Sequence, residues 1–403
     1  MTATIKTFHS GTGDSIFLRL EEGELSYTIM VDCGWYEEPI RHYVQDTLGG
    51  KIDLLIVTHI DNDHIVGVRD MLGMSGISGI KVGRIIFNCY QRNALGEKKK
   101  LDKYQQERLS AIEKEIGLIV GDIVENEEHD VDAPEAMKGL AATILGRRDL
   151  KRAWDKDYTV NGMDIDLKYL GKITFLSPTM KEIENLDNEF RHVLFDELNV
   201  DHTMGVWNKK EDLYEILLRY AMLQSPAADE VGDKDVAGTN DLEDELKKAA
   251  KEPVDTNSIS AANKASLAFV WEKNEHRILF MGDANPDVVV KGLLDHYKEK
   301  PFPVLFDAIK VSHHGSHYNT TAELLRHVDS AHYFFTGGTE GKRPSEAAIG
   351  RIVLREPPEG ISKRTLHFNY MTTFVEKLKG DKALQEKYQF GVETSRNEKK
   401  FAV

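Results

Sequence analysis

Short apolar runs, separated by glycine-rich or acidic turns, dominate the first ninety residues of the chain. Runs of this length between turn residues predict strands, and apolar positions three to four residues apart predict helices. The run at 54–57 is apolar throughout, which is typical of a strand covered on both faces of its sheet. The predicted strands are 5–9, 15–20, 27–32, 54–57 and 82–88, with a short helix at 39–48. Strands that alternate with helices indicate an α/β fold.

The pattern changes in the middle of the chain, where charged, helix-prone segments predominate. Helices are predicted at 104–119, 183–198 and 211–223, and a single strand at 173–176. Residues 229–255 contain ten acidic residues and four lysines, interrupted by glycine and proline. Such a composition cannot bury much apolar surface, so we expect an exposed, mobile acidic segment.

Strand and helix signals return after residue 257. The predicted strands are 266–271, 277–281, 308–312 and 333–336, and the predicted helices are 288–297, 321–327 and 345–353. We therefore interpret residues 1–90 and 257–403 as two halves of one α/β unit. Residues 91–256 are then a mostly helical insertion, which also offers a surface for a protein partner or for self-association.

Composition narrows the class of protein. The chain has 403 residues, 41% of them hydrophobic, which is typical of a folded globular protein. The net charge of −15 argues against broad, passive binding to nucleic acid or anionic lipid. Two cysteines exclude a disulfide framework and a cysteine-based zinc cage, and they fit a reducing compartment. The start has no signal-peptide pattern and no apolar stretch approaches ~18 residues, so we expect a cytoplasmic protein without a membrane partner.

Candidate metal ligands follow three of the predicted strands. Four of them fall within six residues directly after the strand at 54–57, and further carboxylate and imidazole groups follow the strands at 277–281 and 308–312. Imidazole and carboxylate together suit divalent zinc, manganese or iron. Repetition of ligand residues at three strand ends indicates one metal centre. The candidate ligands are His59, Asp61, Asp63, His64, Asp283, His313 and His314.

The segments around these residues resemble the metallo-β-lactamase-fold hydrolases. The likeness rests on His-Ser-Gly-Thr-Gly-Asp-Ser at 9–15, Val-Asp-Cys-Gly at 31–34 and Thr-His-Ile-Asp-Asn-Asp-His-Ile-Val-Gly at 58–67. Asn-Lys-Ala-Ser-Leu at 263–267, Gly-Asp-Ala at 282–284 and Ser-His-His-Gly-Ser at 312–316 complete it. These last pieces are similar to the branch that contains the C-terminal domain of the competence (DNA-uptake) protein ComEC. The resemblance covers residues 1–90 and 257–340.

The resemblance implies a four-layer αββα sandwich with two divalent ions, zinc or manganese, at the edge where the sheets meet. It assigns His59 and Asp61 to one ion, Asp63 and His64 to the other, and Asp283 to a bridge between them. Either His313 or His314 completes the second ion, and we favour His314. The same resemblance implies that Asp63, His64 and Asp283 are the catalytic residues.

The chain departs from the family pattern at two places. Residues 263–266 replace a segment in which much of the superfamily has a ligand histidine, and Arg343 stands where the branch has a histidine. Arginine stays protonated and has no free lone pair, so it does not ligate a metal, but it binds phosphate bidentately. We interpret Arg343 and Lys342 as candidate phosphate contacts, with a solvated surface pair as the alternative. Asn263 and Ser316 are further candidates for substrate binding.

These residues predict a metal-dependent hydrolase, with a phosphodiesterase or nuclease that cleaves DNA or RNA as the leading interpretation. Two ions that hold a hydroxide between them lower the pKa of that water toward ~7 and clamp the attacked group. Lys310, Lys342 and Arg343 fit an anionic substrate, and Trp154 and Tyr158 in the insertion are candidates for base stacking. The alternatives are hydrolysis of a small phosphodiester or other small ester, and a partner-regulated binding protein with a vestigial metal site.

Overall fold

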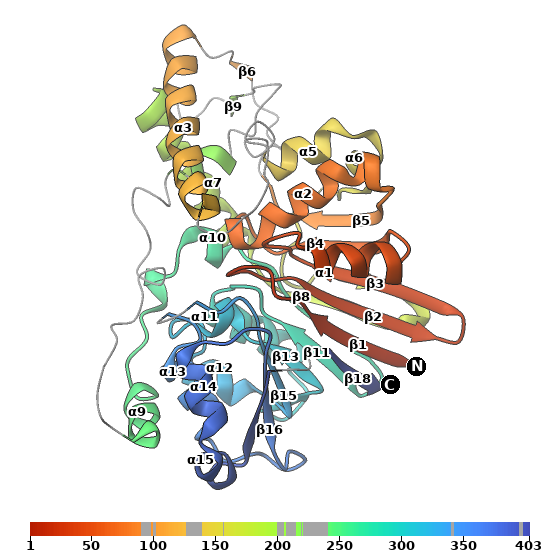
Figure 1. The fold of residues 1–403 in the computed structure, drawn as a ribbon, viewed down its shortest axis with the longest axis vertical. Coiled ribbons are helices and arrows are strands. Elements are labelled where there is room, and N and C mark those ends of the chain that lie inside the picture. Colours follow the sequence, from red (N-terminus) through yellow and green to blue (C-terminus); the bar gives the residue numbers. More distant parts are fainter. Residues whose placement is uncertain are drawn as a thin grey trace.

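The computed structural model describes residues 1–89, 98–99, 102–125, 139–155, 157–199, 205–206, 215–218, 220, 241–339, 342–394 and 398–403. Two large sheets form the body of the molecule (Figure 1). The first has the order β18-β1-β2-β3-β4-β5 and mixes antiparallel and parallel pairs. Its strands are β1 (Thr2–Thr7), β2 (Ile16–Glu22), β3 (Leu25–Val31), β4 (Lys51–Val57), β5 (Lys81–Phe87) and β18 (Glu398–Ala402).

The second sheet has the order β17-β16-β15-β13-β11-β10-β8-β7. Strands β11, β13, β15, β16 and β17 run parallel, so the chain crosses over through helices between them. The strands are β7 (Asp164–Asp166), β8 (Lys172–Ser177), β10 (Ala268–Lys273), β11 (His276–Phe280), β13 (Ala308–Lys310), β15 (His332–Phe335), β16 (Arg364–Phe368) and β17 (Phe390–Glu393). Two short pairs, β12 (Val304–Phe306) with β14 (Val328–Ser330) and β6 (Lys98–Lys99) with β9 (Gly205–Val206), lie outside both sheets.

Three apolar cores separate four layers. Alternate residues of β2 show the principle, because Leu18 packs into the core between the sheets whereas Phe17 packs into the core under the first helical layer. Trp271 and Phe280 supply the other side of the core between the sheets. The third core lies between the second sheet and its helices. The predicted αββα sandwich is confirmed.

Helices cover the outer face of each sheet (Figure 1). The first sheet carries α1 (Glu38–His42), α2 (Asn62–Ser78), α5 (Leu140–Gly146) and α6 (Arg148–Ala153). The second carries α11 (Pro286–His296), α12 (Ala322–His327), α13 (Glu346–Val353), α14 (Thr373–Gly380) and α15 (Lys382–Lys387). Helices α3 (Lys103–Glu125) and α7 (Met180–Leu198) extend beyond one end of the sandwich, where α7 packs on α10 (Ala261–Lys264).

The insertion differs from the prediction in two respects. First, β7 and β8 lie within residues 91–256, yet they pair onto β10 and form the edge of the second sheet. Their alternate residues, such as Ile173, are buried between the sheets, so the helical insertion is not continuous. Second, the expected mobile segment holds α9 (Leu242–Ala249) at its C-terminal end.

Helix α9 is docked rather than mobile. Leu246 is fully buried against the second helical layer, and α9 packs on α13. Glu243 accepts hydrogen bonds from Lys387 and Tyr388, which ties the acidic face of α9 to the body. Residues 229–240 of the acidic segment lie outside the described residues, as does most of the helix predicted at 211–223. Within the described part of the chain, no helix is long and apolar enough to cross a membrane.

Candidate metal centre

The first ligand-bearing loop follows the carboxyl end of β4. It carries His59 and Asp61 and leads into the first turn of α2, where Asp63 and His64 lie. The backbone oxygen of Asp63 accepts a hydrogen bond from the N–H of Asp14 (3.1 Å). A Cβ at Gly13 would lie only 1.7 Å from the same oxygen. The glycine at position 13 therefore permits the backbone contact that fixes this loop.

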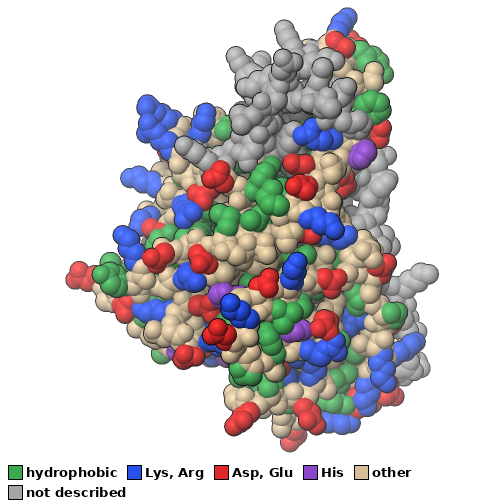
Figure 2. Space-filling view, turned by 180° about the vertical axis from the view of Figure 1, so that it is seen from behind, with side chains coloured by type: hydrophobic (Ala, Val, Ile, Leu, Met, Phe, Trp, Pro, Cys, Tyr) green, Lys and Arg blue, Asp and Glu red, His purple; other side chains and the backbone are tan. Residues whose placement is uncertain are grey.

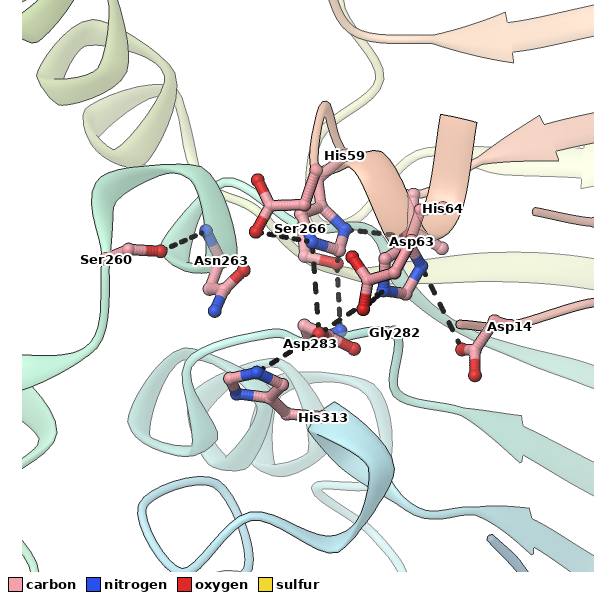
Figure 3. A network of polar contacts seen from close by, with 12 residues as sticks. Asp14, His59, Asp63, His64, Ser260, Asn263, Ser266, Gly282, Asp283 and His313 are labelled. Carbon is pink, nitrogen blue, oxygen red and sulfur yellow. Dashed lines mark hydrogen bonds and ion pairs between the residues drawn. The ribbon is translucent and has the colours of Figure 1, made fainter. Parts of the chain in front are cut away.

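Two further loops bring ligands from the second sheet. Asp283 follows β11, and its N–H donates to Ser266 Oγ (3.0 Å). His313 and His314 follow β13 and have φ angles of 49° and 54°, a backbone conformation that is uncommon outside glycine. Because β11 and β13 are parallel neighbours, their carboxyl ends meet at one edge of the sheet. This edge faces the loop after β4 (Figure 3).

Asp283 lies at the middle of the cluster. Its Oδ2 is 3.4 Å from His64 Nε2, 3.9 Å from His59 Nε2, 3.6 Å from His313 Nε2 and 3.8 Å from His314 Nε2. The remaining two carboxylates border it, with Asp61 Oδ2 3.4 Å from His59 Nε2 and Asp63 Oδ2 3.0 Å from His314 Nε2. The seven predicted metal ligands thus lie together.

Donor atoms of these residues form two overlapping groups that have the spacing of a metal site. His59, His64 and Asp283 form one, and Asp63, His64 and His314 form the other, with the atoms of each group within 4.8 Å of one another. His64 belongs to both. His313 belongs to neither, which favours His314 as the histidine of the second group.

Hydrogen bonds outside the centre fix the tautomers of His59 and His64. Asp32 accepts from Nδ1 of His64 (2.8 Å), so His64 Nε2 faces the centre. Thr58 donates its hydroxyl proton to Asp32 Oδ2 (2.7 Å), which leaves the Thr58 oxygen to accept from Nδ1 of His59 (2.9 Å). Neutral His59 and His64 therefore both present the lone pair of Nε2 to the centre.

The histidines of the second sheet are also held at Nδ1 from outside the centre, and without metal Nε2 of His314 donates to Asp63 Oδ2 (3.0 Å). The carbonyl oxygen of Thr336 can only accept, so Nδ1 of His314 carries the proton (2.9 Å). Nδ1 of His313 bonds to Asn319 Oδ1 (3.1 Å), and the amide of Asn319 is oriented by its donation to the carbonyls of Asp283 and Ala284. Outer partners that hold one ring nitrogen and aim the other inward are typical of metal-binding histidines.

Several polar atoms at the centre are buried without a hydrogen-bond partner. They are His59 Nε2, His64 Nε2, Asp61 Oδ1 and Asp283 Oδ1. A buried polar group without a partner costs about 1–3 kcal/mol, so a cluster of such groups calls for a ligand. Imidazole lone pairs and carboxylates converging on one point are the donor set that divalent zinc or manganese takes. The residues therefore fit divalent metal ions.

Without metal, the centre is a network of opposite charges. Burial alone would raise the pKa of Asp283, but His64, His313 and His314 lower it well below its usual range. Burial would lower the pKa of His64, whereas Asp283 and Asp63 raise it well above the ordinary value. The same carboxylates, with Asp14, outweigh burial at His314 and raise its pKa to about 9. Metal ions and protons therefore compete for the same nitrogens.

Three of the predicted substrate contacts are not placed to bind a substrate at the centre. Lys310 is 1% exposed and forms an ion pair with Asp14, which satisfies its charge inside the protein. The expectation that Lys310 receives an anionic substrate is therefore wrong. Ser316 is buried, and its Oγ accepts from the N–H of Tyr318 (3.2 Å) within a turn. Lys342 is exposed to solvent.

Two of the predicted contacts do border the centre. Asn263 is 1% exposed and lies beside it (Figure 3), where the backbone N–H of Asn263 donates to Ser260 Oγ. Arg343 is 9% exposed, and its Nη2 donates to His313 Nε2 (2.9 Å). Arg343 is therefore in contact with the centre, as the sequence analysis expects of a candidate phosphate contact.

Sequence reasoning gave no role to four residues that support the ligands, namely Asp14, Asp32, Thr58 and Asn319. Asp14 and Asp32 lie in the segments 9–15 and 31–34, so the resemblance contained a signal for them. Thr58 precedes the ligand motif directly. Asn319 is an isolated polar residue in a loop, and only the fold brings it to His313.

The proposed stacking patch in the insertion is not present as predicted. Trp154 is 2% exposed, stacks on Phe87 and donates from Nε1 to the Phe87 carbonyl (2.9 Å). It is a core residue because its indole fills the space between α6 and β5. Figure 2 shows Lys and Arg side chains interspersed with Asp and Glu over the described part of one face, rather than gathered in a basic stripe.

Comparison with known proteins gives a family match near the start of the chain. Residues 11–89 match the family model described as the metallo-beta-lactamase superfamily. This part of the chain is therefore similar to the metallo-β-lactamase superfamily. The matched residues include β2 to β5 and the loop with His59, Asp61, Asp63 and His64. The narrower likeness to the ComEC branch stays a prediction, and no curated protein matches the sequence.

Solved structures with some likeness include the β-hydroxylase CmlA in a mutant form, at 10% identity and a TM-score of 0.41. The match covers all of this chain and 54% of CmlA. A second likeness is to the metallo-beta-lactamase fold protein YhfI from Bacillus subtilis, at 9% identity and a TM-score of 0.36. That match covers all of this chain and all of YhfI. A diphosphatase from the PhnP family (8% identity, TM-score 0.36) is covered over 98% and this chain over 100%. TM-scores this low carry no weight for function.

Proposed function

We propose that this protein is a metal-dependent hydrolase that cleaves a phosphodiester. The observation that carries the proposal is the orientation of the four histidines, each of which presents Nε2 to a cluster of three carboxylates. A structural polar cluster would satisfy its own donors and acceptors, whereas His59 Nε2, His64 Nε2 and Asp283 Oδ1 are buried without a hydrogen-bond partner. The superfamily match to residues 11–89 supports the same class.

The ions would be held by two sets of residues that share members. His59, Asp61 and Asp283 would hold one, and Asp63, His64 and His314, again with Asp283, the other. A divalent ion at such a site acts as a Lewis acid and lowers the pKa of water toward ~7. Among the carboxylates of these sets, Asp63 is the most exposed to solvent. Its side chain is 30% exposed, whereas that of Asp283 is 2% exposed.

That exposure gives Asp63 a separate role. Its Oδ2 lies 3.0 Å from His314 Nε2 and 3.7 Å from His64 Nε2, at the solvent side of the cluster. We assign to this carboxylate the orientation of the attacking water and the acceptance of its proton. The buried Asp283, besides its place in both ligand sets, would hold the histidines of the two sheets together.

A phosphodiester substrate is supported by the cation beside the centre. Arg343 contacts His313 and thereby lies next to the ligand cluster, where a negatively charged ester would be bound. The two candidate substrates are nucleic acid and a small phosphodiester. The burial of Trp154 and the net charge of −15 favour the small substrate, because neither helps to hold a long polyanion.

The test is hydrolysis by chelator-stripped protein to which manganese or zinc is added back. Circular single-stranded and double-stranded DNA report nicking, and bis(p-nitrophenyl) phosphate reports phosphodiester cleavage without the need for a polymer. The variant Asp63→Ala with His64→Ala serves as the blank. Metal-dependent turnover of either substrate that the double variant lacks is expected.

The two substrates separate the candidates. Nicking of circular DNA establishes a nuclease with endo-cleavage. Turnover of bis(p-nitrophenyl) phosphate without nicking favours a small phosphodiester. No turnover of either substrate, together with no bound metal by elemental analysis, would overturn the proposal in favour of a binding protein.

A further inference from the structure

Lys310 occupies an apolar position of the second sheet. It is the last residue of β13, and its register partners on the neighbouring strands are Phe280 of β11 and Phe334 of β15. Both phenylalanines belong to the core between the two sheets. Lys310 lies on the same face of the sheet and is 1% exposed. A buried ammonium group is costly unless it is paired, so the partners of Lys310 indicate why a lysine stands here.

The partners of Lys310 come from both sheets. Its ammonium group forms an ion pair with Asp14, which lies in the loop between β1 and β2 of the first sheet. The same group donates to the carbonyl oxygen of Gly282 (3.1 Å) and lies 3.7 Å from Asp283 Oδ1. Gly282 and Asp283 follow β11 of the second sheet. The ion pair therefore joins the two sheets beside the central carboxylate of the metal centre.

Asp14 in turn contacts three of the candidate ligands. Its Oδ1 is 3.2 Å from His314 Nδ1, its Oδ2 is 4.0 Å from His64 Nδ1, and its N–H donates to the carbonyl oxygen of Asp63 (3.1 Å). Figure 3 shows Asp14 next to His64. Thr336 donates its hydroxyl proton to Asp14 Oδ1, and its carbonyl oxygen accepts from His314 Nδ1 (2.9 Å). One threonine thus holds the carboxylate and the ring together.

These contacts fall on the outer sides of the ligands. Asp14 lies at Nδ1 of both rings, whereas Nε2 of His64 and of His314 lies 3.4 and 3.8 Å from Asp283 Oδ2. Lys310 lies on the Oδ1 side of Asp283, at the distance of an ion pair rather than of a hydrogen bond. Residues that hold a ligand from behind and aim its donor atom inward are typical of metal sites.

Resting on the proposed function, we propose that Lys310 and Asp14 are positioning residues of the metal centre, and that their buried ion pair sets the ligands of both sheets at the spacing that divalent ions require. Replacement of a buried ion pair by neutral residues is often without cost in stability, so stability alone is a weak reason for such a pair. Its contacts offer a better one. The candidate ligands that touch one of its members are Asp63, His64, Asp283 and His314.

A second buried ion pair offers a comparison. Arg364 and Asp329 have side chains that are 0% and 1% exposed and pair at 2.7 Å. Arg364 is the first residue of β16, which runs parallel to β15, β13 and β11. It therefore lies at the end of the sheet opposite to the edge that carries Asp283 and His314. Breaking this second pair should affect stability without affecting the ligands.

The experiment compares Asp14→Asn, Lys310→Met and the double variant with the wild type. Asp14→Asn keeps the shape of the side chain, and Lys310→Met keeps an unbranched chain without the charge. Three quantities are measured: the melting temperature of metal-free protein, the affinity for manganese by competition with a chelator, and kcat and KM for bis(p-nitrophenyl) phosphate at saturating manganese. Asp329→Asn, which breaks the remote pair, is the matched control.

Each single variant leaves one buried charge without its partner, so its metal-free form should melt at a lower temperature. The double variant removes both charges and should recover most of this loss. Manganese affinity should fall about ten- to a hundredfold in the single variants and stay low in the double variant, because the contacts to the ligands are still missing. Asp329→Asn should melt at a lower temperature and keep the wild-type affinity.

Two of these measurements separate position from charge and from folding. Loss of the ammonium group alone would favour a cation, so weaker binding of manganese by Lys310→Met reports displaced ligands rather than altered charge. At saturating manganese, kcat of the double variant should be lower with an unchanged KM, as expected when ligands are misplaced and substrate binding is not affected.

Recovery of both melting temperature and manganese affinity in the double variant would overturn the inference and make the pair a contact of the fold alone. Wild-type or tighter affinity in Lys310→Met would overturn it as well. The affinity comparison requires only one variant that folds, and it requires no turnover. Wild-type protein that binds manganese without hydrolysing the substrate would therefore contradict the proposed hydrolase and still decide the role of the pair. Wild-type protein that binds no manganese would overturn both.

Discussion

Asp32 orients two histidines of the centre by hydrogen bonds, although it does not contact Asp283 at the middle of the cluster. It accepts from His64 Nδ1 and from both the N–H and the hydroxyl of Thr58, so one carboxylate orients His64 directly and His59 through the threonine. Such outer partners raise the basicity of the ligand and fix its ring. The residue stands in the Val-Asp-Cys-Gly segment at the end of β3, with a φ of 54°.

Asp32→Asn tests this role. The amide retains the shape of the carboxylate but provides only one acceptor oxygen, so the rings of His59 and His64 lose part of their support. We expect metal affinity to fall about ten- to a hundredfold. Competition with a chelator of known affinity measures it. Asp295→Asn, at an exposed position of α11, is the control, and equal affinities in both variants would contradict the assignment.

The close contact at Gly13 makes a second prediction at the scale of one residue. A Cβ there would lie 1.7 Å from the Asp63 carbonyl oxygen, so Gly13→Ala must displace the loop that carries Asp63 and His64. We expect a lower melting temperature and loss of bound metal. Gly73→Ala adds the same methyl group in α2 with nothing within 4 Å, and helix propensity should stabilise it by about 0.5–1 kcal/mol. Thermal unfolding and elemental analysis of the pair decide the matter, and a Gly13→Ala variant that keeps its metal would contradict it.

At the scale of elements, α9 is attached to the body through Leu246, the partly buried Leu242 and a few polar contacts. Leu246 is fully buried, and the carbonyl of Leu246 lies 2.6 Å from where a Cβ of Gly350 would be, so α9 and α13 are in backbone contact. Arg351 donates to the carbonyls of Ala250 (3.2 Å) and Glu252 (2.8 Å), just beyond the end of α9.

Leu246→Ala should release α9. Truncation of a buried leucine costs about 2–5 kcal/mol, and the lower figure corresponds to roughly thirtyfold faster hydrogen exchange where local opening exposes the amides. Exchange measured by mass spectrometry over residues 242–249 provides the test. Leu294→Ala, on a leucine that is 42% exposed, should leave exchange in α9 unchanged. Equal exchange in both variants would show that α9 is held by its polar contacts.

A histidine pair between β15 and β16 gives a pH dependence. His332 Nδ1 and His367 Nε2 are 3.0 Å apart, and His367 stacks on Phe334. Burial lowers the pKa of His332 to about 4 and, with His332 beside it, that of His367 to about 3. Unfolding frees both histidines to take up protons near pH 6.5, so the unfolded state binds more protons and the free energy of unfolding falls from pH 6.5 toward 4.

His367→Gln removes one of the two groups and keeps an acceptor for His332. The free energy of unfolding of this variant should fall less steeply between pH 6.5 and 4 than that of the wild type. Denaturant titrations across that range measure the slopes. His192→Gln, on an exposed histidine of α7, should follow the wild type. A His367→Gln slope as steep as the wild-type slope would contradict the assignment.

The strands and helices that the sequence predicted well are those with unambiguous apolar patterns, such as β4 and α11. The strand predicted at 173–176 is confirmed as β8, but nothing local indicates that it pairs with β10, more than ninety residues later. Segment 229–255 is acidic and is expected from its composition to be mobile, yet Leu246 and Leu242 of α9 pack against the core of the second helical layer. The burial of Trp154 was also not predictable, because it depends on the residues that pack on the indole in the fold and not on the neighbours of Trp154 in the sequence.

The clustering of the candidate ligands was predictable from sequence because each candidate follows a strand and carries an imidazole or carboxylate group. The contacts of His313 with Asn319 and Arg343 were not predictable, since these residues meet only through folding. The roles of cations were the least predictable. Lys310 and Arg343 have the same charge and lie near the same carboxylate. Lys310 forms an ion pair with the buried Asp14, whereas Arg343 is hydrogen-bonded to His313.

At the scale of the whole molecule, the metal centre joins parts that are distant in the sequence. His59 and His64 come from the first sheet, and Asp283 and His314 come from the second. The sheets share one apolar core, in which residues of β1 to β5 face residues of β8, β10 and β11. Because this core is common to both halves, we expect the described sandwich to unfold as one cooperative unit.

A ligand that binds only the folded state stabilises that whole unit. At a free metal concentration 100 times the dissociation constant, the gain is about 2.7 kcal/mol, and it grows with further metal. We therefore expect chelator-stripped protein to melt at a lower temperature than metal-loaded protein, in a single transition in both cases. His64→Ala and His314→Ala each remove one ligand, from opposite sheets, and each should abolish most of the metal-induced shift.

The comparison of these two variants decides whether the centre spans the sheets. If both lose the shift, the ion is held jointly and links residues 59–64 to residues 283–314 across the molecule. If only His64→Ala loses it, the metal belongs to the loop after β4 alone, and the second sheet contributes packing rather than ligands. Lys298→Gln, which changes charge at an exposed site, should keep the full shift and excludes a general effect of surface charge.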